Sequence, residues 1–170
     1  MALDRGMVHV YTGNGKGKTS AALGLCLRAV GRGLKCCFIQ FIKGVPTGEM
    51  EAVKHLPGFE FYQTGRPGYD FRITDEDFKR AREGFELALK KSSEVDVLVL
   101  DEVNVAVHLG LLEVSQLIEF IKGKPTCLEL VLTGRHARAE VIELADYVTY
   151  FQLVKHPYYL GRKARKGIDY

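Results

Sequence analysis

Hydrophobic positions along the chain follow two spacings, one typical of buried strands and one typical of helices. Short apolar runs predict strands over residues 8–11, 36–42, 59–63, 95–100, 128–133 and 147–153. Between these runs, apolar residues recur at helical spacing and predict helices over residues 19–30, 49–55, 75–91, 113–122 and 138–145. Strands and helices that alternate in this way predict an α/β fold with a mostly parallel sheet of about six strands and helices on both faces.

Three local features refine this pattern. The strand over residues 36–42 is apolar except for Gln40, which is typical of a strand covered on both faces of a sheet. Thr74 and Asp77 have the spacing of an approximate capping box at a helix start. Residues 64–73 fit neither spacing and predict an irregular loop, because glycine and proline lie there among aromatic and arginine side chains.

Composition places the chain among ordinary globular proteins. It has 170 residues, of which 46% are hydrophobic and 26% charged, so it can bury a core as a single domain over residues 1–170. No apolar run approaches the roughly 20 residues of a membrane-spanning helix. The first seven residues lack the apolar core of a secretory signal. We therefore expect a cytoplasmic protein without a membrane partner.

Charge is concentrated near the C-terminus. The chain carries 24 Lys and Arg against 21 Asp and Glu, a net charge of +3. A basic tail begins at about residue 154, where Asp169 is the only acidic residue opposite several lysines and arginines. An anionic partner and a solvated tail explain this equally well. Basic and aromatic residues do not interleave as in a nucleic-acid platform, so no nucleic-acid partner is expected.

A glycine-rich segment lies between the first predicted strand and the first predicted helix. It resembles the Walker A loop, G-x-x-x-x-G-K-[ST], except that Thr12 stands at the first glycine position. Glycines let backbone N–H groups point at phosphate oxygens, Lys18 adds a cation, and the Thr19 hydroxyl can bind Mg²⁺. The segment predicts a triphosphate site formed by Gly13, Asn14, Gly15, Lys16, Gly17, Lys18, Thr19 and Ser20.

Polar residues also follow two later predicted strands. Asp101 and Glu102 end the most hydrophobic strand in the Walker B form, and with Thr19 they are the candidate Mg²⁺ ligands. Strand-ending Asp-Glu pairs also cap helices. The pair therefore indicates a metal site only in combination with the phosphate loop. Arg135 follows the strand over residues 128–133, where a guanidinium could clamp phosphates or simply lie on the surface.

Taken in order, these segments resemble the P-loop-type ATP:corrinoid adenosyltransferases over nearly the whole chain. The resemblance implies a P-loop NTPase-like fold, and the threonine at the start of the phosphate loop is itself a trait of that family. Besides the phosphate loop and the Asp101-Glu102 pair, the resemblance rests on Gln-Phe-Ile-Lys-Gly at 40–44, Leu-Thr-Gly-Arg at 132–135, Leu-Ala-Asp at 144–146, Val-Lys-His at 154–156 and Gly-Ile-Asp-Tyr at 167–170.

The resemblance implies a reaction and its partners. Co(I) of a corrinoid, cobalamin or cobinamide, attacks C5′ of ATP, and inorganic triphosphate leaves, in adenosylcobalamin biosynthesis or salvage. Mg²⁺ is the expected cofactor, and ATP is the co-substrate. No tightly bound redox cofactor is expected. An external flavoprotein reductase supplies the electron, and the protein is expected to be a homodimer.

The resemblance also suggests residues that face the corrinoid. Relatives carry a Phe-x-Trp pair that presses on the lower face of the corrin, but this chain has no tryptophan. Tyr69 and Phe71 are the nearest counterparts, and they could equally anchor their loop to the core. Lys155 and His156 are the other candidates to face the corrinoid.

Two other functions fit the phosphate loop. A small P-loop kinase or ATPase could use Asp101 and Glu102, and a nucleotide-dependent binding module could use the loop without catalysis. The fate of the phosphates separates the three functions: triphosphate for the adenosyltransferase, phosphate or a phosphorylated acceptor for the kinase or ATPase, and neither for the binding module.

Overall fold

The computed structural model of the chain describes residues 3–68 and 72–169. Its strands are β1 (Val8–Thr12), β2 (Cys36–Gln40), β3 (Phe59–Gln63), β4 (Val97–Asp101), β5 (Glu129–Thr133) and β6 (Tyr147–Tyr150). In these residues they form one six-stranded sheet in the order β3-β2-β4-β5-β1-β6, and every neighbouring pair is parallel. The predicted parallel α/β architecture is confirmed.

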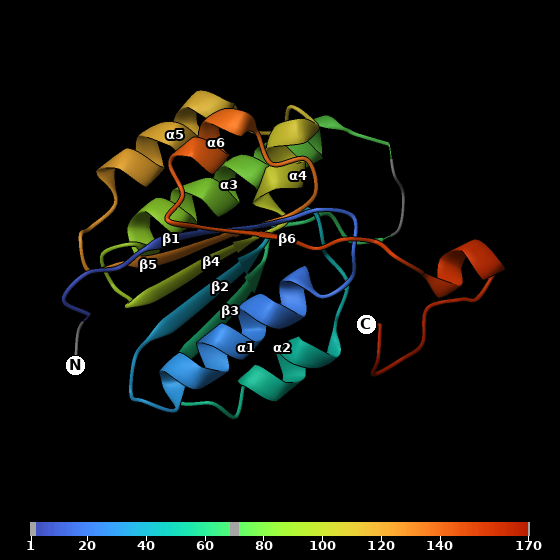
Figure 1. Ribbon diagram of the computed structural model, residues 1–170, viewed down its shortest axis with the longest axis horizontal. Helices are drawn as coiled ribbons and strands as arrows, with labels where there is room; N and C mark the ends of the chain where they lie inside the picture. Colours follow the sequence, from blue (N-terminus) through green and yellow to red (C-terminus); the bar gives the residue numbers. More distant parts are fainter. Residues whose placement is uncertain (1–2, 69–71, 170) are drawn as a thin grey trace.

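Helices cover both faces of the sheet (Figure 1). Two lie on one face, namely α1 (Lys18–Val30) and α2 (Gly48–Val53). The opposite face carries α3 (Asp75–Lys91), α4 (Val103–His108), α5 (Val114–Gly123) and α6 (Ala139–Glu143). Within the described ranges, no helix combines the length and the hydropathy needed to cross a membrane.

The central strands are buried because both of their side-chain directions meet helices. Successive side chains of a strand point to opposite faces of the sheet. On β4, Val99 packs in the cluster on the α1 side, whereas Leu98 and Leu100 pack in the cluster that includes Phe85 of α3. All three β4 side chains are fully buried, which explains why this strand has an unbroken apolar sequence.

Each predicted strand and helix is observed at its predicted position along the chain, with shifts of a few residues at its ends. The strand over residues 59–63 is observed with the same bounds, and the predicted capping box is present, with the Thr74 amide donating to Asp77 Oδ2 at 2.8 Å. The strand predicted to reach residue 42 ends at Gln40, because Ile42 adopts a positive φ of 67°. The last strand ends at Tyr150 instead of residue 153.

Helix α4 was not predicted. Its sequence places valines at 103, 105 and 107, and β-branched residues favour strands over helices. The backbone turns at Glu102, which has a φ of 61°. This residue lies between the end of β4 and the start of α4. A short 3₁₀ helix at Pro157–Leu160 in the tail was also not predicted.

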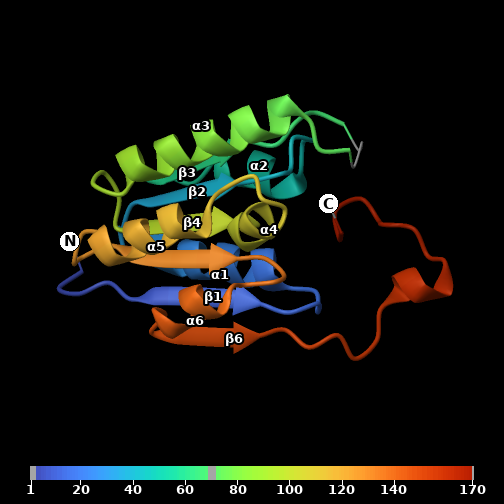
Figure 2. The same cartoon turned by 90° about the horizontal axis from the view of Figure 1, so that it is seen from above.

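Parallel strands bring the carboxyl ends of β1, β2, β4 and β5 to one edge of the sheet, where ligands bind in open α/β folds. Figure 2 shows β1, β4, β5 and β6 pointing the same way, with the C-terminal tail extending beyond that edge. Every residue that the sequence singles out for phosphate or metal lies at one of these strand ends or in the segment that follows it.

Two helical glycines offer a matched test of packing. A methyl group added at Gly24 of α1 meets nothing within 4 Å, whereas one added at Gly84 of α3 lies 2.6 Å from Thr64 Oγ1 and 3.0 Å from Phe41 Cε1. Alanine favours a helix over glycine by about 1 kcal/mol. We expect Gly24→Ala to raise the free energy of unfolding by up to about 1 kcal/mol. Overpacking should make Gly84→Ala lower it by about 1–3 kcal/mol. Urea unfolding measures both, and equal stabilisation by both would contradict this packing.

Candidate nucleotide and metal site

The glycine-rich loop connects β1 to α1 at the carboxyl edge of the sheet. Gly13 and Gly17 have φ angles of 98° and 116°, which L-residues with side chains rarely adopt. Lys18 folds back over the loop, and its Nζ donates to the carbonyl oxygens of Gly13 at 2.7 Å and Gly15 at 2.9 Å. Burial lowers the pKa of Lys18, and the nearby Glu102 carboxylate partly opposes this.

The loop is also held by the chain that leaves β6. The Gly15 amide donates to the Phe151 carbonyl oxygen at 2.7 Å. A Cβ at Gly13 would lie 2.5 Å from that same oxygen, and one at Gly15 would lie 2.7 Å from the Gln152 carbonyl oxygen. The glycines are therefore required for close backbone packing as well as for loop conformation, a constraint that the sequence motif did not reveal.

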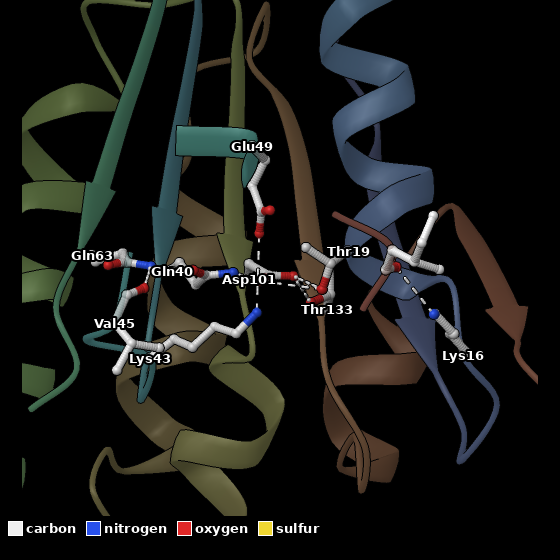
Figure 3. Close-up of polar contacts among 10 residues, drawn as sticks. Lys16, Thr19, Gln40, Lys43, Val45, Glu49, Gln63, Asp101 and Thr133 are labelled. Carbon is white, nitrogen blue, oxygen red and sulfur yellow. Dashed lines mark hydrogen bonds and ion pairs between the residues drawn. The ribbon is translucent and has the colours of Figure 1, made fainter. Parts of the chain in front are cut away.

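Asp101 lies at the centre of the site. Its side chain at the end of β4 is fully buried, and three neighbouring elements supply donors to it (Figure 3). Thr133 Oγ1 of β5 donates to Oδ1 at 2.6 Å, Gln40 Nε2 of β2 donates to Oδ2 at 2.8 Å, and Thr19 Oγ1 of α1 donates to Oδ1 at 3.0 Å. The hydroxyl of the phosphate loop thus meets the carboxylate, as the Walker A and Walker B motifs together predict.

Two adjacent carboxyl groups share this environment. Burial raises the pKa of Asp101, although hydrogen bonds from Thr133, Gln40 and Thr19 favour its charged form. Burial also raises the pKa of Glu102, and the neighbouring Asp101 charge raises it further. Buried negative charges are costly unless cations or hydrogen bonds compensate them. This edge of the sheet therefore favours a cation.

The oxygen atoms at this edge have the chemistry of Mg²⁺ ligands. The Thr19 hydroxyl and the Asp101 carboxylate offer hard oxygen ligands within 3.0 Å of each other. Among residues 3–68 and 72–169, no group of three or more His, Cys, Asp and Glu residues could hold a metal by itself. Mg²⁺ is usually bound through one or two protein oxygens, with waters and substrate phosphates completing its octahedron. The residues present match that mode of binding.

A cavity of about 220 Å³ opens beside Asp101. Its wall is partly apolar, and it includes Lys43, whose Nζ lies 4.0 Å from Glu49 Oε1. The cavity gives the carboxyl edge room for a ligand next to the candidate metal ligands. Its lining residues are Thr19, Gln40, Phe41, Ile42, Lys43, Asp101, Glu102 and Val105.

Backbone strain is concentrated at the same edge. Among the described residues, the non-glycine positions with positive φ are Ile42, Glu102 and His136, at 67°, 61° and 61°. Each lies in the segment directly after β2, β4 or β5. Such conformations cost on the order of 1–3 kcal/mol each and are typical of functional sites.

The structure places other predicted residues around this centre. Arg135 is exposed after β5, close enough for its charge to act on Lys18 and Glu102. Lys16 instead turns to the C-terminal tail, where it pairs with Asp169 and donates to the Ile168 carbonyl oxygen at 3.2 Å. The structure thus brings Lys18, Thr19, Asp101 and Glu102 together but directs Lys16 elsewhere. Asn14 and Ser20 have exposed side chains.

Two of the candidates to face a corrinoid lie in the C-terminal tail. Lys155 is exposed beyond β6, and His156 Nδ1 accepts from the Tyr158 amide at 3.1 Å as the cap of the 3₁₀ helix. Tyr69 and Phe71 lie outside the described residues.

Sequence reasoning did not assign roles to Gln40, Gln63 or Thr133. A lone polar residue in a buried apolar strand was the available signal for Gln40, because a buried amide needs a partner. Thr133 stands in the Leu-Thr-Gly-Arg motif at 132–135, but the motif does not indicate its partner, and no local signal marks Gln63. Both roles depend on which strand ends become neighbours in the sheet.

Comparison with known proteins identifies the family. The sequence model of the ATP:corrinoid adenosyltransferase family BtuR/CobO/CobP matches residues 4–170. The chain belongs to this family. It is similar to the corrinoid adenosyltransferases of Pseudomonas aeruginosa, with 38% identity over 98% of this chain and 85% of the relative, and of Escherichia coli K12, with 37% identity over 98% and 87%. The predicted family and the predicted class of enzyme are confirmed, and this adenosyltransferase uses ATP to modify a corrinoid.

Solved structures of low sequence identity share the fold of this adenosyltransferase. A KaiC-like protein from Pyrococcus horikoshii aligns with a TM-score of 0.60 at 16% identity, over 91% of this chain and 76% of that protein. The cytoplasmic domain of EssC aligns with a TM-score of 0.57 at 14% identity, over 98% of this chain but only 35% of that protein. These similarities support the predicted P-loop NTPase-like fold.

Thr133 provides a direct test of the hydrogen bonds around Asp101. Its hydroxyl donates to the buried carboxylate and accepts from the Glu102 amide at 3.0 Å. Thr133→Val keeps the shape but leaves both groups without this partner. We expect the free energy of unfolding to fall by about 1–3 kcal/mol. Thr133→Ser keeps the hydroxyl and should lose less, as measured by urea unfolding. A valine variant as stable as the serine variant would contradict this role.

Proposed function

We propose that this adenosyltransferase moves the 5′-deoxyadenosyl group of ATP to Co(I) of cobalamin or cobinamide and releases inorganic triphosphate, in adenosylcobalamin biosynthesis or salvage. The observation that carries the proposal is the meeting of the phosphate loop with the buried carboxylate, where Thr19 Oγ1 donates to Asp101 Oδ1 at 3.0 Å beside Lys18. Family membership supplies the two substrates, and this geometry supports a site for the triphosphate.

In the proposed reaction the phosphate chain is the leaving group. The cobalt electron pair forms a bond to C5′, the C5′–O bond breaks, and its electrons depart with the triphosphate. Lys18 and the backbone N–H groups at the start of α1 would stabilise the charge that develops there. Mg²⁺, held by Thr19 and Asp101 with Glu102 nearby, would supply further neutralisation of the phosphate charge when bound.

Attack at C5′ distinguishes this proposal from a kinase or an ATPase. Neither a water nor an acceptor hydroxyl has to be activated at the γ-phosphate. Lys18 and the loop amides then act on the leaving group as a whole. The remaining expectations from the sequence stay predictions: the homodimer, the flavoprotein reductase, the cytoplasmic location, and the corrinoid-facing roles of Tyr69, Phe71, Lys155 and His156.

The phosphate product tests this proposal. We expect chemically reduced cobalamin and ATP labelled at the γ-phosphate to yield labelled triphosphate together with light-sensitive adenosylcobalamin in equal amounts. Lys18→Ala should lower both products by about 10²–10³-fold, because it removes a preorganised cationic contact. Chromatography of the label and the visible spectrum measure the two products. Release of labelled phosphate in proportion to turnover would contradict the proposal and favour an ATPase.

A further inference from the structure

Two glutamine side chains lie end to end beside Asp101 (Figure 3). Gln40 at the end of β2 is fully buried, and its Nε2 donates to Asp101 Oδ2 at 2.8 Å. Its Oε1 accepts from Gln63 Nε2 at the end of β3, at 2.9 Å. Gln63 Nε2 also donates to the Val45 carbonyl oxygen at 2.9 Å. We call Gln40 and Gln63 the amide pair.

The charge of Asp101 dictates the direction of both amides. An ionised carboxylate only accepts hydrogen bonds, so Gln40 must present its NH₂ group to Asp101. Its carbonyl oxygen then faces Gln63, which must donate in turn. The Val45 carbonyl oxygen accepts from the same nitrogen and keeps the Gln63 NH₂ group turned inward. Each member of the chain thus fixes the orientation of the next.

Without Gln63, Asp101 would be the only one of these partners left to orient the Gln40 amide. The terminal torsion of a glutamine side chain is broad and roughly two-fold, so the amide can turn over. An inverted amide would place Oε1 against the Asp101 carboxylate and replace an attraction with a repulsion. Because Gln40 is fully buried, water cannot easily screen that repulsion.

The outer end of the amide pair lies where the segments after β2 and β3 are hydrogen-bonded to each other. The Gly65 amide donates to the Lys43 carbonyl oxygen at 3.0 Å, and the Thr64 amide donates to the Gln40 carbonyl oxygen at 2.9 Å. A Cβ at Gly65 would lie 2.1 Å from the Ile42 carbonyl carbon. The segments after β2 and β3 therefore touch backbone to backbone, and they hold Val45 and Gln63 in place.

We propose that the amide pair is a positioning device that holds the Asp101 carboxylate toward Thr19 in the orientation that receives a divalent cation. The inference rests on the proposed role of Asp101 in binding the metal of Mg-ATP. Neither glutamine touches the reacting atoms in this account. Gln40 acts through Asp101, and Gln63 acts through Gln40.

The test replaces Gln63 with residues of opposite hydrogen-bonding character. Gln63→Glu can only accept when ionised, so it should invert Gln40 and weaken Mn²⁺ binding in the presence of ATP by about tenfold or more. Gln63→Lys can only donate, so it should bind Mn²⁺ more tightly than Gln63→Leu, which makes no hydrogen bond. Electron paramagnetic resonance of free Mn²⁺, with a protein-free titration of Mn²⁺ and ATP as the reference, gives each Kd, and circular dichroism checks folding.

Simple electrostatics predicts the opposite order. An added negative charge should attract Mn²⁺ and an added positive charge should repel it, so Gln63→Glu would bind most tightly and Gln63→Lys most weakly. That order, or affinities equal to wild type, would overturn the role of the amide pair. If Gln63→Glu fails to fold, the order of Gln63→Lys and Gln63→Leu still decides between the two accounts.

Two controls separate this inference from the proposed function. Gln116 of α5 is exposed and accepts from the Glu113 amide through its oxygen at 3.2 Å, so Gln116→Glu should leave Mn²⁺ affinity unchanged. Asp101→Asn should remove most Mn²⁺ affinity. If it does not, the proposed metal site is wrong. If it does while the Gln63 variants bind as wild type does, only the amide pair is overturned.

Discussion

The burial of one carboxylate constrains the whole carboxyl edge of the sheet. Asp101 is fully shielded from water, so the protein must supply the hydrogen bonds that water would otherwise provide. The strand order makes this possible, because β4 lies between β2 and β5, and both neighbours end in a donor side chain. Gln40 and Thr133 are those donors, and Thr19 of the phosphate loop is the third.

This arrangement links the phosphate loop to the rest of the sheet. β1 and β4 are not neighbours, since β5 separates them. Thr133 of β5 closes that gap by donating to Asp101 and accepting from the Glu102 amide. Thr12, which replaces the usual first glycine of the loop, contacts the segment after β5 through a hydrogen bond from the Ala137 amide at 3.4 Å. The loop is therefore positioned from both of its ends.

The sequence was sufficient for the architecture because local patterns determine it. Short apolar runs predicted each strand. The glycine-rich loop indicated Lys18 and Thr19 as candidate phosphate and metal ligands. Helix α4 was missed because its valines favour a strand, and the turn at Glu102 depends on tertiary packing. Local patterns could not show that Gln63 would lie beside Gln40, because the pairing of β2 with β3 brings together residues 23 positions apart.

The tail shows the same limit over a longer distance. Its charge predicted only an anionic partner or a solvated segment. In the structure, the acidic residue of the tail, Asp169, pairs with Lys16 of the phosphate loop. No local pattern indicates a contact between residues 153 positions apart. Such contacts depend on the complete fold.

The most direct test of this account is a crystal structure of the protein with Mn²⁺ and ATP, in which anomalous scattering locates the metal. The account predicts one Mn²⁺ next to Thr19 Oγ1 and the Asp101 carboxylate, with the triphosphate of ATP in the loop at residues 13–19. Because Mn²⁺ accepts the same oxygen ligands as Mg²⁺, its position reports on the site directly. A fully occupied Mn²⁺ bound to ATP but away from Thr19 and Asp101 would contradict the account.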